Sequence, residues 1–190
     1  MNDEPELLAR IRSGAPDDFA EIIRQHQEQV FKILYRYERD AHLIQDLAQE
    51  TFIKVWQARE QFDGRAPFSH WLSRITVHVA LDHLRKRKRI RKEMALDELG
   101  EDALDWLRSE EGEGELQSNQ EREILELALR ELSAEERVVI TLLEIEGRSV
   151  KEIAALTGSS GVAVRVRAFR ARAKLRTALL KMEKNSHERE

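Results

Sequence analysis

One segment near the C-terminal end of the chain is rich in side chains that can contact nucleic acid. It has no acidic residue between Ile153 and Met182, and its basic residues are Arg165, Arg167, Arg170, Arg172, Lys174, Arg176 and Lys181. Such groups neutralise phosphates, and an arginine can also donate two hydrogen bonds to the edge of a guanine. A basic run alone also fits a solvated helix face, so the segment indicates DNA only in a suitable structural context.

Signals for helix ends supply that context. Ser133 and Ser149 are each followed three residues later by a glutamate, which is the capping-box pattern at the start of a helix. Gly147 and Gly158 stand where a helix needs a left-handed C-terminal residue. The expected elements are helices over 134–146, 150–156 and 161–181, with a turn at 157–160. A short helix, a glycine-containing turn and a long helix make a helix-turn-helix, which places its second helix in the DNA major groove.

Charge is distributed unevenly along the chain, although the formal net charge is only −4. The stretch 85–92 holds seven bases and no acid, whereas 93–126 holds thirteen acids and two arginines. The C-terminal helix is then basic again. Because the local field steers a polyanion, the sequence predicts two basic surfaces that are separated by an acidic connector.

Apolar residues at three- and four-residue spacing predict further helices before the first basic run. One follows Asp17 or Asp18 as its N-cap, and others are expected over 41–59 and 68–91, with a loop at 62–67. Only three prolines are present, and good helix formers are abundant, so the chain is predicted to be all-α. The organisation expected is a helical domain over 1–92, a flexible acidic linker over 93–118, and a helix-turn-helix domain over 119–190.

Several classes of protein are disfavoured by composition. The absence of cysteine excludes a disulfide framework and a thiolate zinc site, and fits a reducing compartment. No apolar run has the length of a membrane span, and the N-terminal residues lack a secretory pattern, so a cytoplasmic location is expected. The histidines show no metal-ligand spacing, and no hydrolase or phosphate-loop pattern occurs. We therefore expect no enzyme activity, cofactor, metal or small-molecule substrate.

Four stretches together resemble one family. Asp46–Trp56 is similar to the region-two signature of bacterial sigma factors of the extracytoplasmic-function group. Matches to the same family follow in the same order at Phe68–Ile75, Asp82–Arg87 and Gly161–Arg172. The resemblance covers about residues 16–92 and 119–180 and implies a factor that joins core RNA polymerase and directs it to promoters.

The resemblance implies that the helix over 41–59 docks on the polymerase. The residues carried over for this role are Asp46, Gln49, Glu50, Phe52, Ile53 and Trp56. Four of them, Asp46, Gln49, Glu50 and Ile53, follow the i, i+3, i+4, i+7 pattern and share one stripe of a helix. On the residues alone, a solvated surface with Phe52 and Trp56 partly in the core remains an equal alternative.

By the same resemblance, the loop at 62–67 and the helix after it open and contact the start-proximal (−10) promoter element. The residues implied are Asp63, Gly64, Arg65, Arg74, His78, Arg85 and Arg87. A glycine-containing loop beside a basic helix suits capture of an unstacked base, because it allows close backbone approach and phosphate neutralisation. His78 stands where the family usually has asparagine, and Trp71 is assigned to the core.

Arg165, Val166, Phe169 and Arg170 match the family positions that reach bases of the upstream (−35) element. Their spacing places them on one helix face, with the arginines suited to guanine and the apolar pair to a thymine methyl group. Arg167, Arg172 and Lys174 are assigned to phosphates. Val162, Ala163 and Val166 replace commoner small or hydroxyl residues, whereas Val164, Ala168 and Leu175 are assigned to the core.

Two functions are weighed. The first is a sigma factor that works as a monomer or as a heterodimer with an anti-sigma protein, which in this group is often membrane-anchored. By the resemblance, its linker threads toward the polymerase cleft, although a plain spacer is an open alternative. The second is a stand-alone helix-turn-helix regulator that binds palindromic DNA as a dimer, for which no dimerisation seam is evident.

Overall fold

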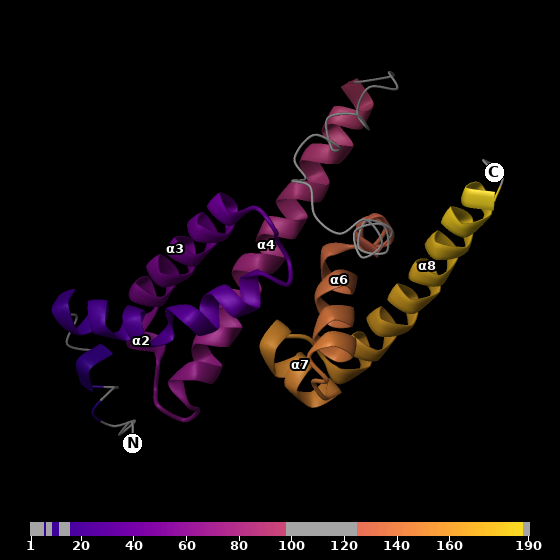
Figure 1. The fold of residues 1–190 in the computed structure, drawn as a ribbon. Coiled ribbons are helices and arrows are strands. Elements are labelled where there is room, and N and C mark those ends of the chain that lie inside the picture. The colour runs from indigo at the N-terminus through magenta and orange to yellow at the C-terminus, as the bar shows by residue number, and fades with distance from the viewer. Residues whose placement is uncertain (1–5, 7–8, 12–15, 98–124, 188–190) are drawn as a thin grey trace. The chain divides into compact units, whose positions relative to one another are not determined.

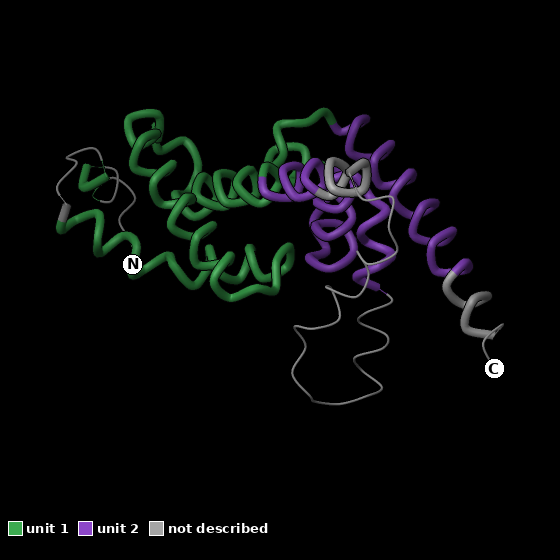
Figure 2. The backbone as a smooth tube through the Cα atoms, turned by 90° about the horizontal axis from the view of Figure 1, so that it is seen from above, with its two compact units in different colours: residues 1–82, 151–160 green, residues 83–150, 161–190 purple. Residues whose placement is uncertain are grey.

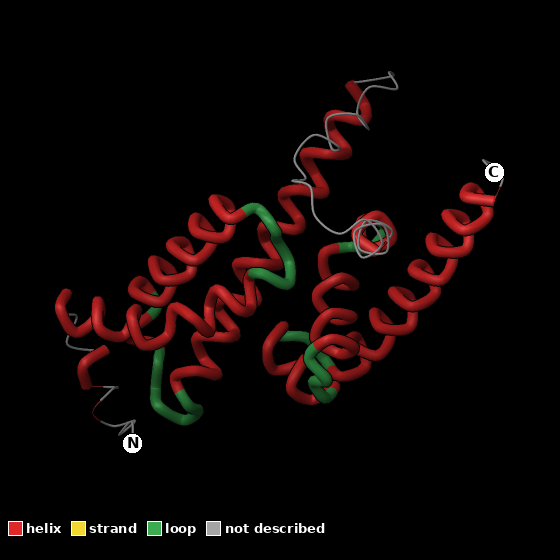
Figure 3. The backbone as a smooth tube through the Cα atoms, viewed as in Figure 1, coloured by secondary structure: helices red, strands yellow, loops and turns green. Residues whose placement is uncertain are grey.

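The computed structural model describes the backbone of residues 6, 9–11, 16–97 and 125–187, and its side chains except those of 16, 91–97 and 182–187. Within these ranges every regular element is helical, which confirms the all-α prediction (Figures 1 and 3). The predicted linker over 93–118 lies outside the described residues, except for 93–97.

Those five residues belong to a helix. The helix α4 runs from Phe68 to Asp97, past the predicted end at residue 91. Residues 92–97 are Lys, Glu, Met, Ala, Leu and Asp, most of which are strong helix formers, and no glycine or proline interrupts them. A change from basic to acidic charge is therefore not a helix boundary.

Two compact units are present, shown in different colours in Figure 2. Unit 1 comprises the described residues up to Asp82 together with 151–160, and unit 2 comprises 83–150 and 161–190. These groupings follow packing rather than chain order. The domain limits given by the sequence remain a prediction.

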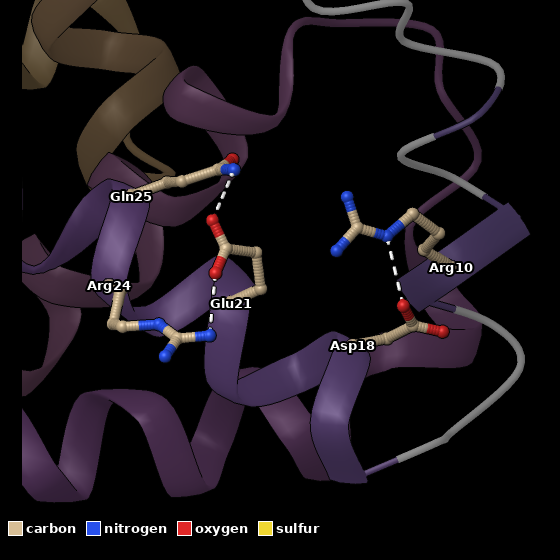
Figure 4. Close-up of polar contacts among 5 residues, drawn as sticks. All are labelled: Arg10, Asp18, Glu21, Arg24 and Gln25. Atoms are coloured by element: carbon tan, nitrogen blue, oxygen red, sulfur yellow. Dashed lines mark hydrogen bonds and ion pairs between the residues drawn. The ribbon is translucent and has the colours of Figure 1, made fainter.

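Unit 1 contains α2 (Pro16–Leu34), α3 (Ala41–Gln57), a 3₁₀ turn (Arg59–Gln61), the first half of α4 and nearly all of α7 (Val150–Thr157). The predicted N-cap of α2 is wrong, because the helix starts at Pro16 and both Asp17 and Asp18 lie in its first turn. Proline is well suited to that position because it has no N–H to leave unpaired. Asp18 is bonded to Arg10 at 3.1 Å (Figure 4).

The same close-up shows Glu21 of α2 between Arg24 at 2.6 Å and Gln25 at 2.9 Å (Figure 4). The hydrogen bond from Gln25, followed by the charge of Arg24, lowers the pKa of the Glu21 carboxyl. These contacts keep an exposed stretch of α2 helical through i, i+3 and i, i+4 pairing.

The break before α3 is organised by two carboxylates. Asp40 is the N-cap, and its Oδ1 accepts hydrogen bonds from the backbone N–H groups of His42 and Leu43 at 2.8 and 3.1 Å. Glu38 is buried and accepts from the backbone N–H of Arg39 at 2.7 Å. The turn between α2 and α3 is thereby fixed without glycine or proline.

Unit 2 contains α6 (Ala134–Ile140), a π-helical turn (Thr141–Ile145), α8 (Gly161–His187) and the second half of α4. The capping box predicted at Ser133 is present: its Oγ accepts from the Glu136 N–H at 3.1 Å, and the Glu136 carboxylate accepts from the Ser133 N–H at 2.8 Å. Leu132, Ile140 and Ala171 form the apolar cluster between α6 and α8, with Leu129 and Leu175 packed against it.

The predicted succession of short helix, turn and long helix is confirmed. The helix α7 spans Val150–Thr157 and α8 begins at Gly161. Gly147 and Gly158 have φ values of +62° and +65°, the left-handed conformation that glycine adopts without strain. The Ser159 N–H closes the end of α7 by donating to the Ala154 carbonyl at 3.1 Å.

Candidate nucleic-acid and protein interfaces

The face of α8 that was predicted to read bases is exposed. Phe169 is 74% exposed and Val166 is 42% exposed, and Arg165 and Arg170 are exposed beside them. The predicted core residues Val164 and Ala168 are buried on the opposite side of the same helix. Exposed apolar side chains that are grouped on one face, as Val166 and Phe169 are, mark interaction sites, so this face has the character of a binding surface.

Val162 extends this face and was not assigned to it from the sequence. It is 66% exposed and precedes Val166 by four residues and Phe169 by seven. Positions i, i+4 and i+7 share one side of a helix, so three apolar groups line up along the surface. That spacing was the available signal.

Two of the three predicted phosphate contacts are engaged by acids of unit 2. Arg172 Nη2 lies 2.6 Å from Glu144 Oε1, and Lys174 Nζ lies 2.7 Å from Glu136 Oε2. Arg167, the third, is partly buried. The basic side of α8 is therefore partly neutralised by its own unit, which the charge pattern of the sequence does not indicate.

The loop at 62–67 is anchored at both ends by buried aromatic rings. Phe62 and Phe68 are almost fully buried, with ring centroids 5.4 Å apart, and Trp71 packs on Phe62 at 5.2 Å. The partial burial of Trp71 between these rings agrees with its assignment to the core. All residues from Asp63 to Pro67 are exposed, so a rigid base presents an open loop.

Within that loop, Asp63 arranges its neighbours. Its Oδ1 accepts from the Arg65 backbone N–H at 3.1 Å, and its Oδ2 lies 3.2 Å from Arg65 Nε. Gly64 between them has φ +74°. The Arg65 side chain is nonetheless 89% exposed, so its guanidinium faces solvent over a turn that is already formed.

The remaining −10 candidates lie on α4. Arg74 is exposed and His78 is partly buried, one helical turn apart in unit 1. Arg85 and Arg87 belong to unit 2, where Arg85 Nε lies 2.9 Å from Glu135 Oε1 and Lys88 Nζ donates to the Leu132 carbonyl at 2.9 Å. The predicted set is therefore divided between the two units, and Arg85 already has an acidic partner.

The candidate docking face on α3 is a clean helical stripe. Asp46, Gln49 and Glu50 are exposed, and Ile53 is 49% exposed. Leu43, at 40% exposed, lies three residues before Asp46 and extends the stripe. Leu43 was missed because its spacing also fits the apolar side of the helix.

Phe52 and Trp56 differ from the rest of the set. Phe52 is buried with Ile44, Leu47 and Val55. Trp56 is partly buried, packs edge-on against Phe19 at 4.8 Å and carries the Arg59 guanidinium 4.6 Å above its ring. These two aromatic residues hold α3 in place, and the exposed stripe is formed by the polar residues together with Leu43 and Ile53.

Lys54 fixes the back of this stripe. Its Nζ lies 2.8 Å from Glu50 Oε1 and 3.7 Å from Asp82 Oδ2 of α4. The hydrogen bond to Glu50 is the main cause that raises the pKa of the Lys54 ammonium. This network of ion pairs includes Glu50 but not Asp46.

The described residues contain no group of three or more histidine, cysteine, aspartate or glutamate side chains placed to hold a metal ion. None of the helices in the described part of the chain combines the length and the apolar character needed to cross a lipid bilayer.

Comparison with known proteins decides the family. The Sigma-70 region 2 model matches residues 22–90, and the Sigma-70 region 4 model matches residues 122–175. The RNA polymerase sigma factor CarQ of Myxococcus xanthus is 31% identical over 176 residues, covering 93% of this chain and 97% of CarQ. The ECF RNA polymerase sigma factor SigE of Mycolicibacterium smegmatis is 37% identical over 170 residues. The chain belongs to the extracytoplasmic-function family of RNA polymerase sigma factors.

This sigma factor aligns over 88% of its own length with SigE but spans only 64% of that relative. A solved structure of the sigma factor RpoE in complex with the anti-sigma factor NepR, from Bartonella quintana, is similar with a TM-score of 0.53 at 25% identity. That likeness covers 86% of this chain and 97% of the other. The region 2 match contains the α3 stripe and the 62–67 loop, and the region 4 match contains the exposed face of α8.

Proposed function

We propose that this sigma factor binds core RNA polymerase through the exposed stripe of α3 and directs it to promoters that carry two elements. The observation that carries the proposal is the pairing of a polar, acidic helix face in the region 2 match with an exposed, basic and aromatic helix face in the region 4 match. It acts as an initiation factor and not as an enzyme. Its domains are taken as 1–92 and 119–190, with the linker at 93–118.

In the region 4 part, Arg165, Val166, Phe169 and Arg170 contact bases of the upstream element. Their exposure supports this role, because a side chain can reach the edge of a base only if it projects from the helix into solvent. Arg167 and Arg172 neutralise phosphates. Arg172 can exchange its exposed partner Glu144 for a phosphate at little cost, since exposed ion pairs contribute only about 0–1 kcal/mol.

In the region 2 part, the loop from Asp63 to Pro67 captures an unstacked base of the start-proximal element. The aromatic anchors Phe62 and Phe68 keep the loop in shape while Gly64 lets the backbone approach the base. Arg65 and Arg74 are exposed for the strand. His78, Arg85 and Arg87 are assigned to the same promoter element.

Binding through two elements suits a tethered pair of weak readers. Each half alone is expected to bind weakly, whereas the tether makes the second contact intramolecular and raises the combined affinity. We further propose that the protein is cytoplasmic and is either a monomer or, when an anti-sigma protein holds it inactive, a heterodimer with that inhibitor. The complex of the similar RpoE with its anti-sigma factor supports this mode of control.

The test is transcription in vitro from a genomic template with core polymerase, followed by sequencing of the transcripts. The proposal predicts a set of start sites that share two elements and disappear when this sigma factor is left out. If core polymerase with the protein gives no more specific transcripts than core polymerase alone, the proposed function is wrong.

A further inference from the structure

We propose that Lys174 is a positioning residue that holds α8 on the first turn of α6, and not a phosphate contact as its place in the basic run suggests. The inference rests on the proposed function of α8 as the reader of the upstream element. Lys174 Nζ lies 2.7 Å from Glu136 Oε2, and the Glu136 side chain is only 7% exposed. A lysine of α8 thus forms an ion pair with an almost fully buried glutamate.

The same carboxylate also completes the capping box of α6. Glu136 Oε2 accepts from the Ser133 N–H at 2.8 Å and also from Lys174, and the Ser133 Oγ accepts from the Glu136 N–H. The start of α6 and the middle of α8 therefore share one acceptor atom. Leu175, next to Lys174 in sequence, packs on the apolar cluster of Leu132, Ile140 and Ala171. The polar and the apolar contact fix the same turn of α8.

Moving Lys174 to a DNA phosphate would leave Glu136 charged and buried. Burial has the largest single influence on the pKa of Glu136 and raises it, but the bonds from Lys174 and Ser133 and the charges of Lys174 and Lys88 together lower the pKa below its usual value. The carboxylate is therefore ionised at neutral pH. The Lys174 side chain is itself 46% exposed, so only the acid of this pair is buried. Because a buried charge left without its partner is costly, Lys174 is expected to remain bound when α8 meets DNA.

Arg172 provides the matched control on the same helix. Its pair with Glu144 is as short, at 2.6 Å, but the two side chains are 57% and 51% exposed. Such a pair is screened by solvent and salt and is weak. Two cations separated by one residue in the sequence thus have different expected roles: Arg172 is available for a phosphate, whereas Lys174 is committed to Glu136.

The contact is tested first by hydrogen exchange of the full-length chain, followed over the peptide that covers residues 133–140. Lys174→Met and Glu136→Gln are each expected to raise exchange there by roughly tenfold, the lower end of the effect of one lost charge-assisted hydrogen bond. Glutamine keeps the capping acceptor, so Glu136→Gln isolates the charge. The double variant is expected to exchange no faster than the stronger single variant, Lys174→Arg to restore protection, and Arg172→Met to leave it unchanged.

The role in DNA binding is tested by the salt dependence of promoter binding by the assembled holoenzyme. Log K falls as log salt rises, and the loss of one phosphate contact decreases the magnitude of that slope by about 0.9. Arg172→Met is expected to show that decrease, and Lys174→Met to weaken binding with the slope unchanged. A decrease of the slope in Lys174→Met with unchanged exchange at 133–140 would overturn the inference.

Failure of the proposed function would look different. The wild-type holoenzyme would then show no promoter-specific binding, and the exchange experiment alone would decide the contact. Unaltered exchange in both Lys174→Met and Glu136→Gln would sink the inference in that case too.

Discussion

The exposed faces of α3 and α8 are built alike and carry opposite chemistry. Each helix buries one side in its own unit, with Leu47 and Val55 in α3 and Val164 and Ala171 in α8. On the exposed side, α3 presents the acids Asp46 and Glu50, whereas α8 presents bases together with Phe169. Helix geometry supplies the stripe in both cases, and the charge of the stripe determines the class of partner.

The two faces should therefore respond differently to the same treatment. A basic face on a polyanion gains affinity by releasing counterions and loses it steeply with salt. An acidic face on a protein depends on matched charges and buried contacts, with a weaker dependence on salt.

The largest effect is expected from reversing a charge on α3. Asp46→Arg should lower the affinity for core polymerase by roughly 100-fold. An acidic α3 stripe is expected to meet a basic surface of the polymerase, and the new arginine would repel that surface. Binding is measured by titration of labelled protein with core polymerase. Glu28→Arg, the same change at an exposed acid of α2, is the control. Equal losses in both variants would remove the special status of the α3 stripe.

The next largest effect is expected from removing a side chain of α8 that is proposed to contact a DNA base. Arg170→Ala is expected to lower promoter binding by roughly 10-fold, within the 1–3 kcal/mol of a bidentate arginine–guanine contact, with core binding retained. The effect should depend on the base pair that Arg170 contacts, and it is measured with a library of upstream elements. Arg176→Ala, an exposed arginine further along α8, is the control. A uniform loss across all sequences would instead assign Arg170 to a phosphate.

Acid should loosen unit 2 through Glu136. Its pKa is lowered in the folded chain, so the ionised carboxylate stabilises the fold at a pH above its unfolded pKa, and that contribution is lost as the pH falls through the folded value. Protection over 133–140, measured as the exchange rate relative to the intrinsic amide rate at each pH, should therefore fall as the pH drops below the ordinary glutamate pKa of 4.5. Glu136→Gln should show the lower protection at neutral pH and a flatter dependence of protection on pH.

The smallest effect is expected at the turn before α8. Gly158→Ala should destabilise the protein by about 1 kcal/mol, because alanine is strained in the left-handed region while its Cβ would meet nothing within 4 Å. Thermal unfolding followed by circular dichroism measures the change. Gly147→Ala, with a similar φ and equally open surroundings, should match it. A much larger loss at Gly158 alone would point to a role for this turn in presenting α8.

Much of the fold was predictable from local signals. Ser133, Gly147 and Gly158 gave the ends of helices, and the apolar spacing in α8 separated Val164 from Val166 correctly. The irregular features were not predictable in this way. The π-helical turn after Ile140 depends on how α6 packs, and the extension of α4 to Asp97 follows helix propensity where only a change of charge was visible.

The candidate site was predictable as a set of faces but not as a set of partners. Phe169 and Ile53 were assigned to exposed faces, and both are exposed. Phe52 was grouped with the polymerase contacts because family positions were carried over without burial, and it lies in the core. Lys174 and Glu136 are 38 residues apart in the sequence, so no local pattern could reveal that Glu136 forms an ion pair with this lysine of the basic run.

The central claim is that α3 binds polymerase and α8 reads DNA, and one paired measurement tests it most directly. Asp46→Arg and Phe169→Ala are each assayed for core polymerase affinity and, at polymerase concentrations that saturate binding, for transcription from a promoter with an intact or a scrambled upstream element. The account predicts that Asp46→Arg loses core affinity but still distinguishes the two promoters when saturated. It predicts that Phe169→Ala keeps core affinity and loses that distinction. Loss of both properties in either variant would contradict the division of function between the two helices.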